Sequence, residues 1–162
     1  MWFLTNDESR IWSQRTGYRL DDAHRPLIKS GVHSVNKSLA DMKISRLTWL
    51  SRAIAEYLEP FDECLLWVTL WGVWGSSENL HLYYGLRESY GDRRQLSAGP
   101  GHLFAVHEDS DLATFVQLGL MFGWDFYLLT SPISQMAFVS HDEFIQIYAD
   151  HAAAAQKGLA IS

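Results

Sequence analysis

Imidazole and carboxylate side chains gather at two places in the chain. The first place has two histidines and three acids: His102, His107, Glu108, Asp109 and Asp111. The second place has one histidine directly before two acids: His141, Asp142 and Glu143. Such side chains are the usual ligands of zinc, iron and manganese, and they also act as general acids and bases. The pattern therefore raises a small metal-dependent hydrolase with a His/carboxylate rim as one hypothesis.

The spacing of these residues matches no established metal motif. His107 is not followed by a second histidine four residues later, as an HExxH zinc helix requires. The acids after it lack the glycine and the distant glutamate of an EF-hand loop. Acids in a first helical turn already complement the helix dipole. We therefore expect helix starts here and predict no cofactor. If a metal were bound, its candidate ligands would be His102, His107 and Asp109.

Motifs for nucleophilic and phosphate chemistry are missing from the sequence. No serine lies in a GxSxG pattern, and no GxGxxG loop occurs. The single cysteine, Cys64, lies inside an apolar run and away from a helix start, where a thiol pKa would fall. These observations favour a binding protein over an enzyme.

Aromatic side chains are the next feature, with seven Trp, seven Tyr and eight Phe. Trp74 follows an apolar run and precedes Gly75, where its ring would overhang the next helix. Tyr83 and Arg87 share the expected helix, and Tyr and Arg are typical of binding hot spots. Together with the helix-start residues, this gives the predicted binding set: Trp74, Glu78, Tyr83, Arg87, His107 and Glu108.

The net charge of −6 restricts the class of partner. Backbone recognition of nucleic acid needs clustered Lys and Arg, so we expect no nucleic acid. An acidic chain favours a basic partner protein. Inhibitor and immunity-type proteins against toxins share this physical type, being small, acidic and poor in motifs. An accessory or oligomeric scaffold subunit is a further alternative.

Location follows from the same composition. The first ten residues, MWFLTNDESR, have no basic region before their apolar patch, so no signal peptide is predicted. The longest apolar stretch, residues 112–130, contains Gln117, Asp125 and two glycines. A buried charge of that kind is costly in a bilayer. The chain is therefore expected to be soluble, cytoplasmic and free of membrane contact.

The elements that must position these residues follow a repeated order of apolar run, polar cluster and helical run. Helices are expected over residues 45–58, from a cap at 76 or 77 to 90, from a cap at 109 or 110 to 122, and over 144–157, the last opened by a capping box at Ser140–Glu143. Strands are expected over 64–74, 102–107, 124–129 and 135–139, with Trp67, Thr69 and Trp71 on one face.

This order predicts an α/β domain, with α+β as the alternative. We expect a small mixed sheet of three or four strands flanked by about four helices, with the first three strands parallel and the fourth in an antiparallel hairpin. Parallel strands would bring Ser76–Glu78 and Glu108–Asp109 to one edge and His141 to the opposite edge. Residues 1–37 are expected to form an irregular arm docked on a domain of residues 38–162, and the arm could join two copies in a homodimer.

Overall fold

The computed structural model describes residues 1–23, 25–27, 33–39, 44–72 and 80–149. Four α-helices lie within these residues: α1 (Asn6–Arg15), α2 (Ile44–Leu58), α3 (Leu80–Ser89) and α4 (Asp109–Phe122). A short 3-10 helix, η2 (Leu96–Ala98), precedes the sixth strand. The strands of the same residues are β1 (Trp2–Leu4), β2 (Arg19–Leu20), β3 (Pro26–Leu27), β4 (His33–Ser38), β5 (Glu63–Leu70), β6 (Gly101–Ala105), β7 (Asp125–Ser131), β8 (Gln135–Ser140) and β9 (Phe144–Ala149).

One large sheet dominates the fold and runs in the order β1-β6-β5-β7-β8-β9-β4. Each of its neighbouring pairs is antiparallel. The class is therefore α+β, the alternative that the sequence left open, and the expected small mixed sheet with parallel strands is wrong. The connection through α4 joins β6 to β7, which β5 separates. The connection that contains α3 joins β5 to β6, which are neighbours but antiparallel. The expected β7–β8 hairpin is confirmed.

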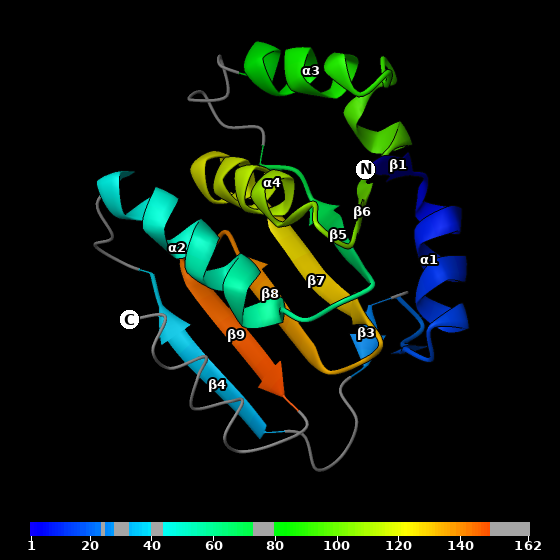
Figure 1. Cartoon of the computed structure of the whole chain (residues 1–162), viewed down its shortest axis with the longest axis vertical. Coiled ribbons are helices and arrows are strands. Elements are labelled where there is room, and N and C mark those ends of the chain that lie inside the picture. The colour runs from blue at the N-terminus through cyan, green and yellow to red at the C-terminus, as the bar shows by residue number, and fades with distance from the viewer. Residues whose placement is uncertain (24, 28–32, 40–43, 73–79, 150–162) are drawn as a thin grey trace.

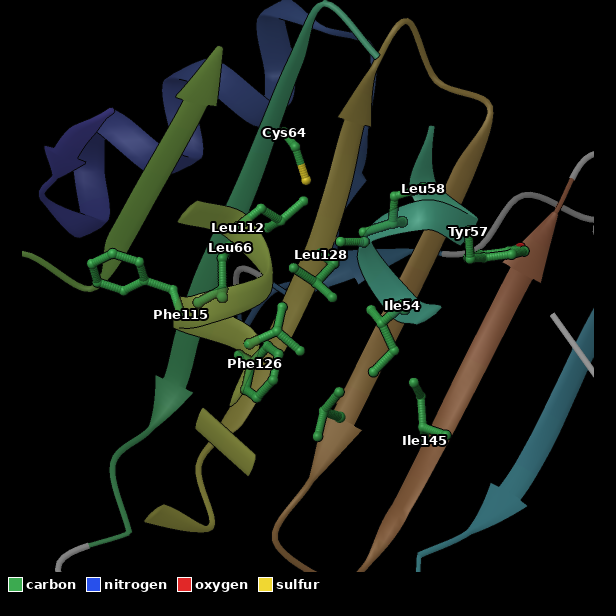
Figure 2. Packing of buried hydrophobic residues seen from close by; sticks show 14 of the residues in the cluster. Ile54, Tyr57, Leu58, Cys64, Leu66, Leu112, Phe115, Phe126, Leu128 and Ile145 are labelled. Carbon is green, nitrogen blue, oxygen red and sulfur yellow. The ribbon is translucent and has the colours of Figure 1, made fainter. Parts of the chain in front are cut away.

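Helices α2 and α4 pack side by side across one face of this sheet (Figure 1). Their apolar side chains meet alternate residues of the strands in one cluster, which Figure 2 shows with Ile54 and Leu58 from α2, Leu112 and Phe115 from α4, and Leu66 and Leu128 from the sheet. Burying such side chains contributes roughly 1.5–3 kcal/mol each. This core therefore fixes α2 and α4 relative to β5 and β7.

The opposite face of the sheet carries a second, smaller core. Trp12 of α1 and Tyr18 pack there against Leu65, Leu103 and Leu129. A capping box starts α1, since Thr5 accepts from the Glu8 N–H while the Glu8 carboxylate accepts from the Thr5 N–H. The first residues of the chain thus form regular elements, with β1 paired to β6. The division at residue 37 stays a prediction.

Strand β5 has an irregularity that separates two tryptophans. Its register against β7 shifts between Val68 and Leu70, as at a β-bulge. Trp67 therefore packs in the α1-side core, whereas Trp71 packs against the core under α4. The prediction that the two rings share one face is wrong, because the extra residue at the bulge changes the alternation of side chains.

The expected helix over residues 144–157 is also wrong in its described part, since Phe144–Ala149 is strand β9. Ser140–Glu143 forms the β8–β9 turn, in which the Glu143 N–H donates to the Ser140 carbonyl, instead of a capping box. Residues 150–157 lie outside the described residues. The helix expected from a cap at 109 or 110 to 122 is confirmed as α4, although its N-cap is Glu108, and it ends at Gly123 in the left-handed conformation. Within the described ranges, no helix is long and apolar enough to cross a membrane.

Candidate functional site

An acidic surface lies where α2 ends and α4 begins. Glu56 and Glu59, in and just after the last turn of α2, line a groove of about 440 Å³ together with Asp109 from the first turn of α4. All three side chains are exposed. Among the described residues that line the groove, Arg52 is the one cation. We call Glu56, Glu59, Asp62, Val106, His107 and Asp109 the acidic rim.

The helix dipoles act in opposite directions on the two sides of this groove. Asp109 lies at the amino end of α4, where the partial positive charge of the helix favours an anion. Glu56 and Glu59 lie at the carboxyl end of α2, where the partial charge is negative, and the last turn of α2 holds no basic residue. Neither glutamate is in an ion pair with any described residue. The two glutamates therefore do not stabilise the end of α2, and helix stability does not explain the negative charge there.

Asp62 and Val106, two further members of the rim, are held by backbone bonds. The Asp62 N–H donates to the Ser131 carbonyl at 2.7 Å, and the Asp62 carbonyl accepts from the Val106 N–H at 2.9 Å. Val106 is 51% exposed although it is apolar. The next residue, His107, is exposed and has φ 71°, a conformation that is uncommon outside glycine. An apolar contact and an imidazole thus border the carboxylates.

Glu108 has a structural role beside the rim. Its carboxylate binds the Met1 amino group and accepts from the Ala105 N–H at 2.7 Å. Burial would raise the pKa of Glu108, but the bonds to the Met1 amine and the Ala105 N–H lower it below its ordinary value. The side chain thereby links β1 to the start of α4. The prediction that Glu108 contacts a partner stays untested, and its carboxylate is already engaged.

His102 is buried and lies away from the rim. Its Nε2 is 2.6 Å from the Tyr83 hydroxyl, and its Nδ1 is 3.1 Å from the Pro100 carbonyl oxygen. Burial, with the Arg87 charge as the second cause, lowers the pKa of His102 to about 3. Since His107 and Asp109 lie beyond the end of β6, the three metal candidates are not brought together. The described part of the chain holds no group of three His, Cys, Asp or Glu placed to bind a metal.

Tyr83 and Arg87 are not the exposed binding patch that the sequence predicted. Both are fully buried in α3, and Arg87 pairs with Asp92 at 2.6 Å. The Arg87 guanidinium also lies over the Phe3 ring at 4.9 Å. The helix turns this face inward because β1 and the aromatic cluster around Phe115 lie beneath it. The other two predicted binding residues from this region, Trp74 and Glu78, lie outside the described residues.

His141 lies at the opposite end of the sheet from His107, as predicted. Its Nδ1 is 2.8 Å from Asp125 Oδ1, which raises the pKa of His141. The prediction that two helix starts share an edge rested on parallel strands, and β5 and β6 are antiparallel. Its first helix start, Ser76–Glu78, lies outside the described residues. Sequence reasoning missed Glu56 and Glu59, although acids at a helix end just before Pro60 were a visible signal.

Comparison of the chain with protein-family models, with curated proteins and with solved structures finds no match.

Proposed function

We propose that this chain binds a basic segment of another protein through the acidic rim. The observation that carries the proposal is the position of Glu56 and Glu59 at the carboxyl end of α2, where the helix dipole opposes their charge. A lysine or arginine of a partner would relieve this repulsion and would meet Asp109 across the same groove.

The surroundings of the groove support a macromolecular partner. Val106 offers an exposed apolar contact next to the carboxylates, and His107 offers an exposed ring. The net charge of −6 adds long-range attraction for a basic protein and a faster encounter.

An inhibitor or immunity-type role is the form of this proposal that best fits a small acidic chain, and a cytoplasmic location belongs to it. Neutralising a basic toxin needs a complementary acidic surface, which the rim supplies. A hydrolase built on His102, His107 and Asp109 has less support, because His102 is buried and bonded to Tyr83.

Charge reversal combined with crosslinking tests the proposal. The wild-type protein, Glu59→Lys and the control Asp142→Lys are used to capture partners from the native host, and a carbodiimide then couples carboxylates to adjacent lysines. Asp142 is exposed and lies at the other end of the sheet, and its substitution changes the net charge by the same amount. We expect a basic partner that wild type and Asp142→Lys retain and Glu59→Lys loses, with crosslinks at Glu56, Glu59 or Asp109.

Two results would overturn this assignment. One is a partner that Glu59→Lys retains at wild-type affinity. The other is a set of crosslinks confined to carboxylates outside the rim. Salt provides an independent measurement, because association that depends on these charges slows steeply as ionic strength rises.

A homodimer formed through the N-terminal segment is the second candidate. Trp2 is 58% exposed on β1, an outer strand of the sheet, and borders a hollow of about 540 Å³ with Tyr90 and Arg93. Trp, Tyr and Arg are the residue types enriched in hot spots. Light scattering should report a dimer that Trp2→Ser converts to a monomer; a wild-type protein that is monomeric at high concentration removes this candidate.

A further inference from the structure

A second recess, which shares no residue with the acidic rim, lies beside α1. It has a volume of about 410 Å³ and is bounded by α1, by residues 23 and 25, by the end of β5 and by the segment from Ser97 to Pro100. We call it the tryptophan cleft, because Trp67 and Trp71 both line it. Its size lies within the range of roughly 300–1,000 Å³ that small-molecule sites occupy.

The two indole rings are held in place by different contacts. The Trp67 Nε1–H donates to the Asn6 Oδ1 at 3.0 Å, which ties the ring to the first turn of α1. Trp71 packs edge-on against Trp124 with 4.6 Å between ring centroids. The two rings leave the chain on opposite faces of the sheet, and both residues border the cleft where β5 ends. The cleft therefore has ordered aromatic walls.

Arginine side chains give the cleft an excess of hydrogen-bond donors. The Arg25 Nε–H donates to Asp21 Oδ2 at 2.9 Å, and the Arg25 backbone N–H donates to Asp21 Oδ1 at 2.7 Å. This anchors the guanidinium, whose terminal nitrogens have no acceptor among the described residues. Arg10 makes one long contact of 3.4 Å with Asp7. Two planar forks of donors thus line the same recess.

A neutral donor adds to the same preference. Ser97 also lines the cleft and carries a hydroxyl group, whereas the Thr69 hydroxyl already donates to the Asp125 carbonyl at 3.3 Å. Among the described lining residues, Asp7 alone carries a carboxylate. Arginine recognises carboxylate and phosphate groups through paired N–H bonds, and aromatic rings stack on flat ligands. The recess presents arginine donors where the acidic rim presents carboxylates, so one ligand would not suit both.

We propose that the tryptophan cleft binds a small organic anion that carries a flat ring and either a carboxylate or a phosphate group. The anionic group lies at Arg10 and Arg25, and the ring lies against Trp71. This site is independent of the acidic rim, because the two share no residue. Failure of either proposal therefore leaves the other standing.

Titration with matched probes tests the site. Calorimetry measures affinity, and the Trp71 indole N–H signal in a nitrogen–proton spectrum, assigned with Trp71→Phe, reports the location. One probe series is adenosine monophosphate, adenosine and inorganic phosphate; the other is indoleacetate and indoleacetamide. We expect saturable binding of at least one ring-bearing anion with a shift of the Trp71 signal. Its neutral counterpart should bind about tenfold more weakly or worse, since hydrogen bonds to a charged group are lost.

Variants with opposite expected signs sharpen the test. Arg25→Gln and Arg10→Gln should each weaken the anion about tenfold. Asp7→Asn should tighten it, because a repelling carboxylate is removed. Arg19→Gln is the matched control, since Arg19 is exposed and lies outside the cleft.

The proposal is overturned if neither ring-bearing anion saturates at millimolar concentration. It is equally overturned if adenosine or indoleacetamide binds as tightly as its charged counterpart, if inorganic phosphate alone binds as tightly as adenosine monophosphate, or if Arg25→Gln leaves the affinity unchanged. The series that binds assigns the anionic group as phosphate or carboxylate.

Discussion

The hydroxyl of Tyr83 lies 2.6 Å from Nε2 of His102, and both side chains are fully buried. The contact joins α3 to β6 within a cluster of rings that includes Phe3 and Phe115. Because burial lowers the pKa of His102, the imidazole is neutral at physiological pH. Its Nδ1 faces the carbonyl oxygens of Leu66 and Pro100, so that nitrogen carries the proton and Nε2 accepts from Tyr83.

Removing this hydroxyl should destabilise the fold. Tyr83→Phe keeps the ring but leaves the buried His102 Nε2 without its donor. An unsatisfied buried acceptor costs about 1–3 kcal/mol. Urea unfolding measures the loss, and Tyr84→Phe is the control because Tyr84 is exposed. A Tyr83→Phe variant as stable as the control would show that the hydroxyl contributes nothing.

The stability of the protein should fall on mild acidification. The pKa of His102 is about 3 when folded, against 6.5 for an ordinary histidine. Below pH 6.5 the unfolded chain therefore binds a proton that the folded chain does not bind. The free energy of unfolding decreases as pH falls, by up to about 1.4 kcal/mol per pH unit.

The variant His102→Gln isolates this effect. His141 acts with the opposite sign, since its pKa is raised and its stabilisation is present below pH 6.5 and lost as pH rises. It contributes equally to both proteins, so the difference in slope between about pH 7 and about pH 5 belongs to His102. Equal slopes for the two proteins in denaturant titrations would contradict the assignment.

The last described strand shows why one element was predicted wrongly. Residues 144–149, FIQIYA, alternate in burial, with Ile145 and Ile147 on the buried side. This period of two indicates a strand. The alanines that follow have high helix propensity, and a SHDE run precedes the segment, so two local helix signals outweighed the alternation. Pairing with β8 and β4 decided the outcome, and a single segment does not reveal its pairing.

Strand positions were easier to predict than strand partners. The runs that became β5, β6, β7 and β8 were recognised, because continuous apolar and β-branched residues mark buried strands. Their pairing was wrong, because insertion of β5 between β6 and β7 leaves no trace in either run. The candidate site was predicted wrongly for the same reason, because contacts between distant segments are not visible in the sequence. Tyr83 and Arg87 were interpreted as part of a helix surface. Their neighbours Phe3 and Asp92, which help to bury them, were not identified from the sequence.

The buried charges of Arg87 and Asp92 should respond unequally to neutralisation. Asp92 keeps Arg94 as a second partner at 3.0 Å when Arg87 is removed, whereas Arg87 has no second anion among the described ion pairs. Asp92→Asn should therefore cost about 3–5 kcal/mol, since it leaves a buried cation unpaired. Arg87→Met should cost less, because Nε and Nη1 of Arg87 have no hydrogen-bond partner among the described residues and a long apolar chain fills the space. Urea titrations that rank Arg87→Met as the more damaging variant would refute this argument.

Two helical glycines provide a matched pair for the packing of the fold. A Cβ at Gly119 in α4 would lie 2.6 Å from Cε1 of Phe126, a ring that the core holds on β7. Gly119→Ala should therefore separate the helix from the sheet and cost about 1–3 kcal/mol. A Cβ at Gly85 in α3 would meet no atom within 4 Å. Gly85→Ala should instead stabilise the protein by about 0.5–1 kcal/mol, because alanine is the better helix former. Thermal unfolding of both variants measures the sign of each change in stability. A stabilised Gly119→Ala would mean that α4 does not contact β7 at this position.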